Sequence, residues 1–235
     1  MNETVYFNDF GIVKYSQAYA WMQEARMQLA ANQIDESINL FEHPATYTLG
    51  VQAQTNNILA DDSQLKQLGI ETFQVDRGGD VTCHNEQQLV VYPIINLRKR
   101  KIKPVQYVRS LEEIIIATLG KFNIIGERIP GKPGIWTGQN KIGSIGISIK
   151  QGITSHGFSI NVNNDLSFFD YINTCGIDNL SVTSIEKKLA KQVDFDLVKK
   201  FVVNEFMKKF TISDRTIHSV NIEEIYNNNT TVRIS

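Results

Sequence analysis

The chain has 235 residues, of which 42% are hydrophobic and 21% are charged, and it carries a formal net charge of -1 at pH 7. This composition is typical of a globular protein with one well-filled core, so we expect residues 1–235 to form a single domain. The near-neutral charge argues against a nucleic-acid partner, which needs clustered Lys and Arg, and no apolar run approaches the roughly 18 residues that span a bilayer.

The cysteine count and the N-terminal sequence bear on the cellular compartment. Two cysteines, Cys83 and Cys175, are too few for a disulfide framework. The first residues of the chain also lack the basic and apolar regions of a secretory signal. We therefore expect a cytoplasmic protein with reduced thiols, and a buried, inert thiol is the default interpretation of either cysteine.

The first half of the chain predicts a helix followed by strands. Apolar residues recur every three to four positions over 15–29, which indicates an amphipathic helix. Alternating apolar and polar residues indicate a strand over 38–43, and a second strand is expected over 72–75. The nearly continuous apolar run over 89–95 predicts a strand that is buried on both faces.

The second half predicts further helices around a pair of strands. One helix is expected over 104–122 and another over 194–210, where the Asp194 carboxylate can cap the first turn. Between them the apolar period changes to two over 141–149 and 154–162, which predicts neighbouring strands joined by a tight turn. Strands and helices do not alternate strictly, so we expect an α+β fold with a mixed, largely antiparallel sheet flanked by helices.

Nucleotide-binding motifs are not supported by the sequence. The segment 126–132 has the glycine spacing of a phosphate-binding loop, but the next residue is Pro133. The motif needs a Ser or Thr hydroxyl at that position for magnesium, and proline lacks the backbone N–H that faces phosphate. We interpret the segment as a turn, and we expect neither a nucleotide cofactor nor an activity that spends ATP.

The histidines give no sign of a metal site. His43, His84, His156 and His218 are widely spaced, and no pair has the close spacing of zinc or iron ligands. His43 and His218 are interpreted as loop or surface residues. For His84 and His156 the sequence leaves two roles open, a structural hydrogen-bonding role and that of a proton carrier.

Three segments combine glycines with reactive or polar residues, and they are the candidates for a functional site. They are 77–84, 141–146, and 156–157 with 173–176. Glycines within the predicted strand over 141–149 cost stability unless a ligand or another backbone must approach closely. Lys141 begins the same strand, and Cys175 precedes a glycine in a predicted turn, where an exposed thiol can react.

These segments belong to a longer ordered set of motifs by which the chain resembles the lipoyl(octanoyl) transferases. The set extends over about residues 40–185 and consists, in order, of HPATYTLG (43–50), RGGDVT (77–82) followed by His84, QLVVYP (88–93), KIGSIG (141–146), SHG (155–157) with Asn161-Val162, and Ile172-Asn173 with Cys175-Gly176. Any one motif is weakly specific, whereas the ordered set is highly specific.

The resemblance implies both a fold and a reaction. The implied fold is that of the catalytic domain of biotin and lipoate protein ligases. The implied enzyme is an acyltransferase that moves an octanoyl group from acyl carrier protein to a lysine of a lipoyl domain, the first step of protein lipoylation. The acceptor would belong to a 2-oxoacid dehydrogenase complex or be the glycine cleavage H protein, and no cofactor is implied.

The resemblance also implies roles for individual residues. Cys175 matches the nucleophile that carries the acyl group as a thioester, and Lys141 matches the lysine that partners it. The residues expected to bind the acyl substrate are Arg77, Gly78, Gly79, Asp80, Val81, Thr82, Cys83, His84, Ser144, Ile145, Gly146, His156, Gly157, Phe158 and Ser159.

The chain departs from the family pattern around His84. The usual His-Gly-Pro-Gly-Gln is replaced after the histidine by Asn-Glu-Gln-Gln over 85–88, so we expect ordinary backbone in place of a tight turn. Cys83 replaces the usual aromatic residue. We expect its thiol to be buried and to point away from the His84 side chain, because adjacent residues of a strand face opposite sides.

Two alternative functions stay open on the sequence. An ATP-dependent lipoate ligase with the same fold would activate lipoate as an adenylate and would not need Cys175. A catalytically idle module that binds acyl groups or carrier proteins is favoured by the altered stretch over 85–88.

Overall fold

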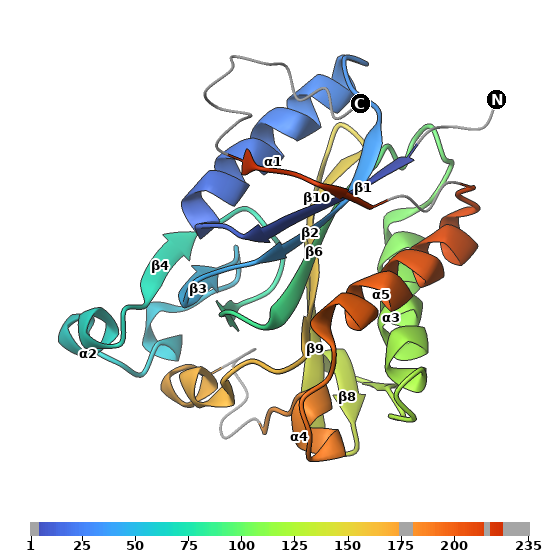
Figure 1. Cartoon of the computed structure of the whole chain (residues 1–235). Coiled ribbons are helices and arrows are strands. Elements are labelled where there is room, and N and C mark those ends of the chain that lie inside the picture. Colours follow the sequence, from blue (N-terminus) through green and yellow to red (C-terminus); the bar gives the residue numbers. More distant parts are fainter. Residues whose placement is uncertain (1–4, 174–180, 214–216, 223–235) are drawn as a thin grey trace.

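The computed structural model describes residues 5–173, 181–213 and 217–222, whose strands form a larger and a smaller sheet (Figure 1). The larger sheet has the spatial order β11 (Ile217–Ser219), β1 (Val5–Ile12), β2 (Glu36–Glu42), β6 (Gln88–Ile94), β10 (Ile153–Asn161), β9 (Asn140–Lys150), β8 (Lys132–Thr137) and β7 (Glu127–Ile129). The smaller sheet has the order β4 (Glu71–Gln74), β3 (Thr46–Leu49) and β5 (Val81–His84).

Most strand pairs of the larger sheet are antiparallel. β1 pairs in parallel with β2 and β11, whereas the pairs from β2 through β6, β10, β9 and β8 to β7 are antiparallel. In the smaller sheet β3 is parallel to β4 and antiparallel to β5. The prediction of an α+β fold with a mixed, largely antiparallel sheet is therefore confirmed.

Helices cover both faces of the larger sheet (Figure 1). The helices are α1 (Tyr15–Ala30), α2 (Asp62–Gln67), α3 (Pro104–Gly120), α4 (Ile185–Leu189) and α5 (Phe195–Phe210), with short 3-10 helices η1 (Thr55–Asn57) and η2 (Leu166–Tyr171). α1 packs on one face in a cluster with Val90 and Tyr92 of β6, while α3 and α5 pack on the other face with Leu89 and Val91. Every residue of β6 is buried, which confirms the prediction for this strand.

The other elements predicted from periodicity are also present. α1, α3 and α5 occupy the three predicted helical segments, and Asp194 caps α5 by accepting hydrogen bonds from the backbone N–H groups of Asp196 and Leu197. β9 and β10 form the predicted antiparallel pair. The segment 126–132 includes β7 and the turn to β8, so its interpretation as a turn is correct apart from the short strand.

A membrane-crossing helix would have to be long and strongly apolar, and none of the helices in the described part of the chain meets both conditions.

Candidate active site

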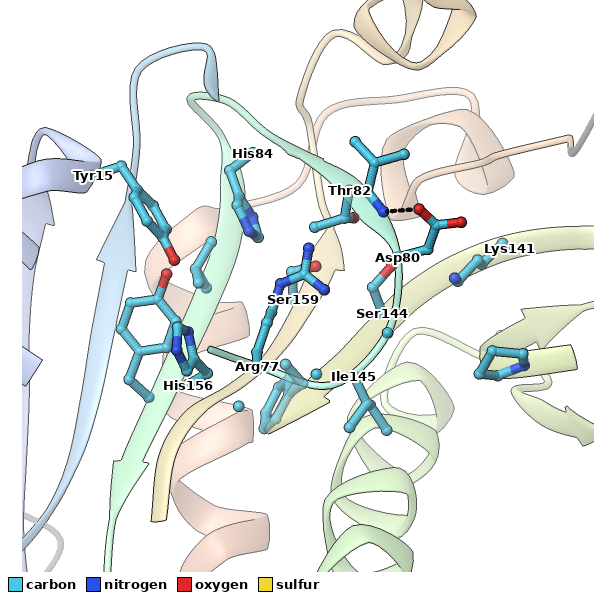
Figure 2. A pocket seen from close by; sticks show the side chains of 18 residues that line it. Tyr15, Arg77, Asp80, Thr82, His84, Lys141, Ser144, Ile145, His156 and Ser159 are labelled. Atoms are coloured by element: carbon cyan, nitrogen blue, oxygen red, sulfur yellow. Dashed lines mark hydrogen bonds between the residues drawn. The ribbon is translucent and has the colours of Figure 1, made fainter. Parts of the chain in front are cut away.

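A pocket lies over the larger sheet, where the segment leading into β5 covers β9 and β10 (Figure 2). Its empty volume, including the space open to solvent at its mouth, is about 580 Å³. It is lined by Tyr15, Arg77, Gly79, Asp80, Val81, Thr82, His84, Val90, Tyr92, Pro133, Lys141, Ser144, Ile145, Gly146, His156, Gly157, Phe158 and Ser159.

One cross-strand row forms the floor of this pocket. Ser144 of β9 pairs with Ser159 of β10, and Ser159 pairs in turn with Val90 of β6. Directly paired residues of a sheet point to the same face, so the three side chains stand in line across the strands. Neighbouring strands are about 4.8 Å apart, so successive side chains of this row are spaced by about this distance along the pocket floor.

Most of the residues predicted from the sequence meet at this pocket. Of the predicted residues that the structure describes, Gly78 and Cys83 do not line it. The Gly78 backbone is used in a different contact, because its N–H donates to the carbonyl of Ile147. Cys83 is fully buried in the hydrophobic cluster of the smaller sheet, where burial raises the pKa of its thiol well above the usual range. The expectation of a buried Cys83 thiol is confirmed.

Sequence reasoning missed four lining residues, Tyr15, Val90, Tyr92 and Pro133. Tyr15 had been counted only as part of a helix face, and Val90 and Tyr92 as part of a strand buried on both sides. The available signal was the alternation within β6, which sends Val90 and Tyr92 to the same face. Pro133 was considered only as a break in a nucleotide motif.

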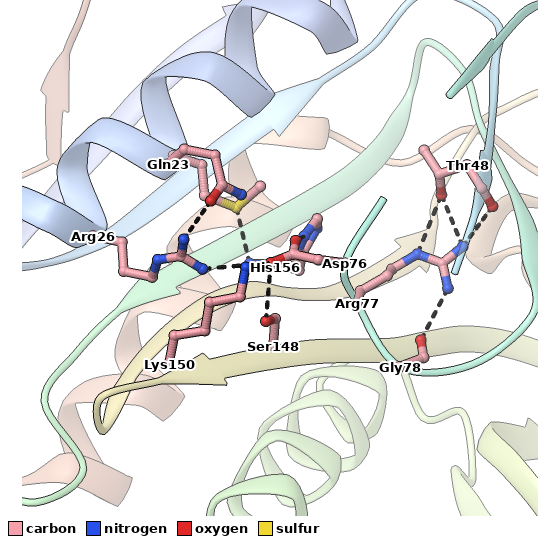
Figure 3. A network of polar contacts seen from close by, with 10 residues as sticks. Gln23, Arg26, Thr48, Asp76, Arg77, Gly78, Ser148, Lys150 and His156 are labelled. Carbon is pink, nitrogen blue, oxygen red and sulfur yellow. Dashed lines mark hydrogen bonds and ion pairs between the residues drawn. The ribbon is translucent and has the colours of Figure 1, made fainter. Parts of the chain in front are cut away.

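Arg77 is buried at the pocket, and its guanidinium is held by hydrogen bonds to Thr48 and to the Gly78 carbonyl (Figure 3). Its Nε and Nη2 donate to the Thr48 hydroxyl at 3.2 and 2.9 Å, Nη2 also donates to the Thr48 carbonyl at 2.6 Å, and Nη1 donates to the Gly78 carbonyl at 3.0 Å. A Cβ on Gly146 would lie 2.9 Å from Arg77 Cδ and 3.0 Å from the Gly78 oxygen. Gly146 therefore lets this segment close over β9, the close approach that strand glycines predicted.

Lys141 lies at the β8 side of the pocket with only 4% of its surface exposed. Its alkyl chain passes over Gly134, where a Cβ would be 2.6 Å from Lys141 Cε. The Lys141 backbone pairs with the segment after the undescribed residues: its N–H donates to the Ser181 carbonyl and its carbonyl accepts from the Thr183 N–H, both at 2.9 Å.

Cys175 lies outside the described residues, but the chain on either side of it is anchored next to the pocket. Asn173 N–H donates to the Asn57 carbonyl at 2.8 Å, and the Asn57 amide donates to the Asp80 carboxylate at 2.6 Å. Asp80 lines the pocket. On the other side, Ser181 is bonded to Lys141, which also lines it.

His84 is a neutral imidazole with a defined tautomer. The Gln88 amide nitrogen donates to the Cys83 carbonyl and to Asn161 Oδ1, so its oxygen faces His84 Nδ1 at 2.7 Å. Nδ1 must therefore carry the proton, and Nε2 keeps a lone pair. Burial lowers the pKa of His84 to about 3, with a smaller contribution from His43, so the ring is neutral at physiological pH.

His156 is oriented by a charged network behind the pocket (Figure 3). Its Nε2 lies 2.8 Å from Asp76 Oδ1, and the other carboxylate oxygen is 2.6 Å from Lys150 Nζ and 3.5 Å from Arg26 Nη1. The hydrogen bond from His156 and the nearby cations hold the pKa of Asp76 well below its usual range. Burial lowers the pKa of His156 in spite of the carboxylate, so we assign a neutral ring that donates Nε2–H to Asp76.

His43 is fully buried, so its interpretation as a loop or surface residue was wrong. Its Nδ1 donates to the Val13 carbonyl at 2.7 Å, and its Nε2 accepts from the Tyr92 hydroxyl at 2.9 Å. Tyr92 and Tyr15 both line the pocket, and Figure 2 shows Tyr15 at its end farther from Lys141. His218, the other histidine of that interpretation, is half-buried on β11.

The altered stretch over 85–88 still makes a tight turn, contrary to our expectation of ordinary backbone. Gln87 has a φ of 64°, which supplies the left-handed conformation that a glycine would otherwise provide. Its N–H donates to the Glu42 carboxylate at 2.7 Å, and the Asn85 amide donates to the Asp165 carbonyl at 2.7 Å. The wall that carries His84 therefore keeps a fixed connection to β6.

Comparison with known proteins identifies the family. Residues 14–207 match the model of the lipoyl protein ligase A/B catalytic domain. An octanoyltransferase of Alkaliphilus metalliredigens is 38% identical over 86% of this chain and 93% of its own length, and one of Pelobacter propionicus is 40% identical over 85% and 92%. The chain belongs to the lipoyl protein ligase A/B catalytic-domain family. Within it the chain groups with the octanoyltransferases, and it is an acyltransferase.

Solved structures agree on the fold. A bi-partite lipoate protein ligase from Thermoplasma acidophilum superposes with a TM-score of 0.68 at 13% identity, covering 97% of this chain and 93% of that one. A biotin protein ligase from Aquifex aeolicus gives 0.51 at 10% identity, covering 96% and 75%. The expected biotin and lipoate ligase fold is confirmed.

Proposed function

We propose that the chain transfers an octanoyl group from a carrier-protein thioester to a lysine of a lipoyl domain, through an acyl thioester on Cys175. The observation that carries the proposal is the anchoring of Asn173 and Ser181 next to the pocket, on either side of that cysteine. Cys175 is two residues from Asn173, so their Cα atoms are at most about 7.6 Å apart. This connectivity, together with the position of Lys141 in the pocket lining, supports Cys175 as the thiol that receives the acyl group.

The first half-reaction exchanges one thioester for another. A free cysteine has a pKa of about 8.5 and is mostly protonated at neutral pH, so the thiol needs a nearby cation or base. Lys141 can accept the thiol proton and then, as an ammonium, stabilise the thiolate. The Cys175 sulfur attacks the acyl carbonyl carbon, the bond from that carbon to the carrier sulfur breaks, and the carrier thiolate takes the proton back from Lys141. No ATP is needed, because one thioester replaces another.

The second half-reaction forms an amide. The neutral amine of an acceptor lysine attacks the acyl carbon on Cys175, the carbon–sulfur bond breaks, and the amine proton passes to the departing thiolate by way of Lys141. Both half-reactions pass through a tetrahedral oxyanion. Backbone N–H groups near Gly146 or Cys175 would stabilise it, and in other enzymes one such donor contributes about 3–4 kcal/mol.

The pocket wall suits a medium-length acyl chain. The lining includes apolar residues from three strands, Ile145, Phe158 and Val90. The Val90 side chain is on the same face as Ser144 and Ser159, whereas the side chains of Ile145 and Phe158 pack in the core on the other face. The curated relatives are named octanoyltransferases, which supports octanoyl as the acyl group. The acyl carrier protein as donor and a lipoyl domain of a 2-oxoacid dehydrogenase complex or the glycine cleavage H protein as acceptor complete the proposal. We place this reaction in the cytoplasm and assign it to one catalytic domain.

The proposal is preferred over an ATP-dependent lipoate ligase and over an idle binding module. The octanoyltransferases match at close to 40% identity, whereas the ligase shares only the fold at 13%. The tight turn retained over 85–88 removes the reason for expecting a distorted pocket in an idle module.

The test is to incubate the protein with octanoyl-carrier protein and to measure the intact mass of each chain. We expect one added octanoyl group, located on Cys175 by peptide mapping. Cys175→Ser should abolish the thioester, and Lys141→Ala should slow its formation by about 100-fold, the lower range for lost acid–base catalysis.

Cys83→Ala is the matched control, because this second thiol is buried in a hydrophobic cluster away from the pocket. It should acquire the octanoyl group at the wild-type rate. Normal transfer by Cys175→Ser, or acylation that requires Cys83, would refute the proposal. Transfer that starts only when ATP and free acid are supplied would favour the ligase.

A further inference from the structure

The middle of the pocket floor is polar although the proposed acyl chain is apolar. Ser144 and Ser159 occupy adjacent positions of the cross-strand row, and both line the pocket. In Figure 2 they lie between Lys141 on one side and Tyr15 and His156 on the other. The next residue in the row, Val90, is apolar. A chain that enters beside Lys141 therefore crosses two hydroxyls before it reaches Val90.

Neither serine hydroxyl forms a hydrogen bond with any part of the chain that the structure describes, although Ser159 is only 4% exposed. Both oxygens are open to the pocket, unlike the sealed and unpartnered hydroxyl of Thr82. His84, on the facing wall, adds the Nε2 lone pair that its tautomer leaves available. A buried hydroxyl without a partner destabilises a protein, so a ligand or water must complete these groups.

A plain hydrocarbon chain cannot complete them. It would displace water from both hydroxyls and leave them without partners, which is unfavourable. A chain that carries its own hydroxyl at this level can donate to one serine and accept from the other. We propose, building on the proposed octanoyl transfer, that the pocket also accepts medium-chain acyl thioesters with a hydroxyl in mid-chain, and that Ser144 and Ser159 bind this hydroxyl.

The register of the sheet determines which carbon the serines meet. The Lys141 side chain lies against Gly134 of β8, one strand away from Ser144 and two strands away from Ser159. With about 4.8 Å between strands, the two hydroxyls are about 5 to 10 Å beyond the position of the amine. A hydroxyl close to the thioester would fall short of both serines, and one at the terminal carbon would lie beyond them.

The test compares carrier-bound octanoyl donors that are unsubstituted or hydroxylated near the thioester, in mid-chain, or at the end. The readout is kcat/KM for transfer to a lipoyl domain. The wild-type protein should favour the mid-chain hydroxyl over the other two hydroxylated donors by at least about tenfold. In the double variant Ser144→Ala, Ser159→Ala this preference should disappear.

Ser155→Ala is the matched control. Ser155 is on the same strand as Ser159, and its hydroxyl is also buried without a partner, but it does not line the pocket. This variant should keep the wild-type preference. The urea unfolding midpoint reports whether each variant is folded.

Each remaining outcome counts against a specific claim. A wild-type protein that transfers octanoyl but rejects every hydroxylated donor would overturn the inference and leave the proposed function intact. An equal loss of kcat with all donors in the double variant would assign the serines to the reacting carbonyl and would also overturn it. Failure to transfer even plain octanoyl would refute the proposed function, and the inference with it.

Discussion

Gly134 has no side chain at the point where the alkyl chain of Lys141 crosses β8. A Cβ at this position would lie 2.6 Å from Lys141 Cε and 2.5 Å from the Gly143 carbonyl oxygen. The Gly134 φ of 104° is also one that residues with side chains rarely adopt. Gly134 thus positions the amine by leaving space for the chain that carries it.

The first prediction concerns this contact. Gly134→Ala should displace the Lys141 amine and slow acylation of Cys175 by at least about tenfold, since small misplacements of catalytic groups have large effects on rate. The measurement is the single-turnover rate with octanoyl-carrier protein as a function of pH, because a displaced amine also changes the ionisation of the thiol.

Gly131→Ala provides the control for backbone strain. Gly131 has a φ of 78° at the β7–β8 turn, but a Cβ there would meet open space. Both variants carry the strain of a positive φ, which costs about 1 kcal/mol. Gly134→Ala should lose more stability than Gly131→Ala, because its Cβ also meets the Gly143 carbonyl oxygen. Only Gly134→Ala should lose acylation rate, and equal rates in the two variants would remove the positioning role.

The elements that periodicity predicted are those that bury a regular face. α1, α3 and α5 each pack one stripe on the sheet, and β6 is buried on both faces. The short strand β3 was not predicted. The equally short β4 was predicted over 72–75, and β5 was anticipated only in the opposite-facing Cys83 and His84. β8 was missed because it contains Pro133 and Gly134, which normally argue against a strand.

The site could be predicted from the sequence only where the residue type itself indicates a structural role. Glycines in strands indicated where backbones approach, and Gly146 does admit the segment with Arg77. His43 has no such signal: its neighbours in sequence do not show that Tyr92 and the Val13 carbonyl will surround it. The charged network around Asp76 could not be predicted from the sequence either, because its other members come from three separate elements, α1, β9 and β10.

A second prediction concerns Gly146. Gly146→Ala should push the 77–79 segment off β9, because the new Cβ would be 2.9 Å from Arg77 Cδ and 3.0 Å from the Gly78 oxygen. Neither atom is the free end of a flexible chain, since the guanidinium is tied to Thr48. We expect the KM for octanoyl-carrier protein to rise by about tenfold or more, because the pocket wall moves. Unchanged KM and kcat would show that the wall tolerates the methyl group.

The Asp76 network yields a third prediction, which separates a buried contact from an exposed one. Asp76→Ala leaves the buried His156 without its acceptor and should lower the free energy of unfolding by about 1–3 kcal/mol. Lys150→Ala removes an ion pair whose lysine side chain is 55% exposed, and such pairs contribute about 0–1 kcal/mol. Urea unfolding of both variants tests the order, and a larger loss for Lys150→Ala would contradict it.

The last prediction follows from two buried histidines. Burial lowers the pKa of His43 to about 4 and that of His84 to about 3, whereas an unfolded histidine has a pKa of about 6.5. Below pH 6.5 these two histidines are therefore protonated in the unfolded chain while they stay neutral in the folded chain. Their contribution to stability is complete above pH 6.5 and is lost as the pH falls towards 4 and then 3, by up to about 1.4 kcal/mol per pH unit for each histidine.

The window that isolates this effect is pH 6.5 to 5, above the range in which most carboxylates titrate. The free energy of unfolding, measured in urea across it, should fall with decreasing pH. In His43→Gln the slope of unfolding free energy against pH should be shallower by the contribution of about one proton, because Gln cannot titrate. The Gln side chain can still donate to the Val13 carbonyl and accept from the Tyr92 hydroxyl. The same slope in wild type and variant would mean that His43 is protonated in the folded protein, and the hydrogen bond it accepts from the Tyr92 hydroxyl could then not exist.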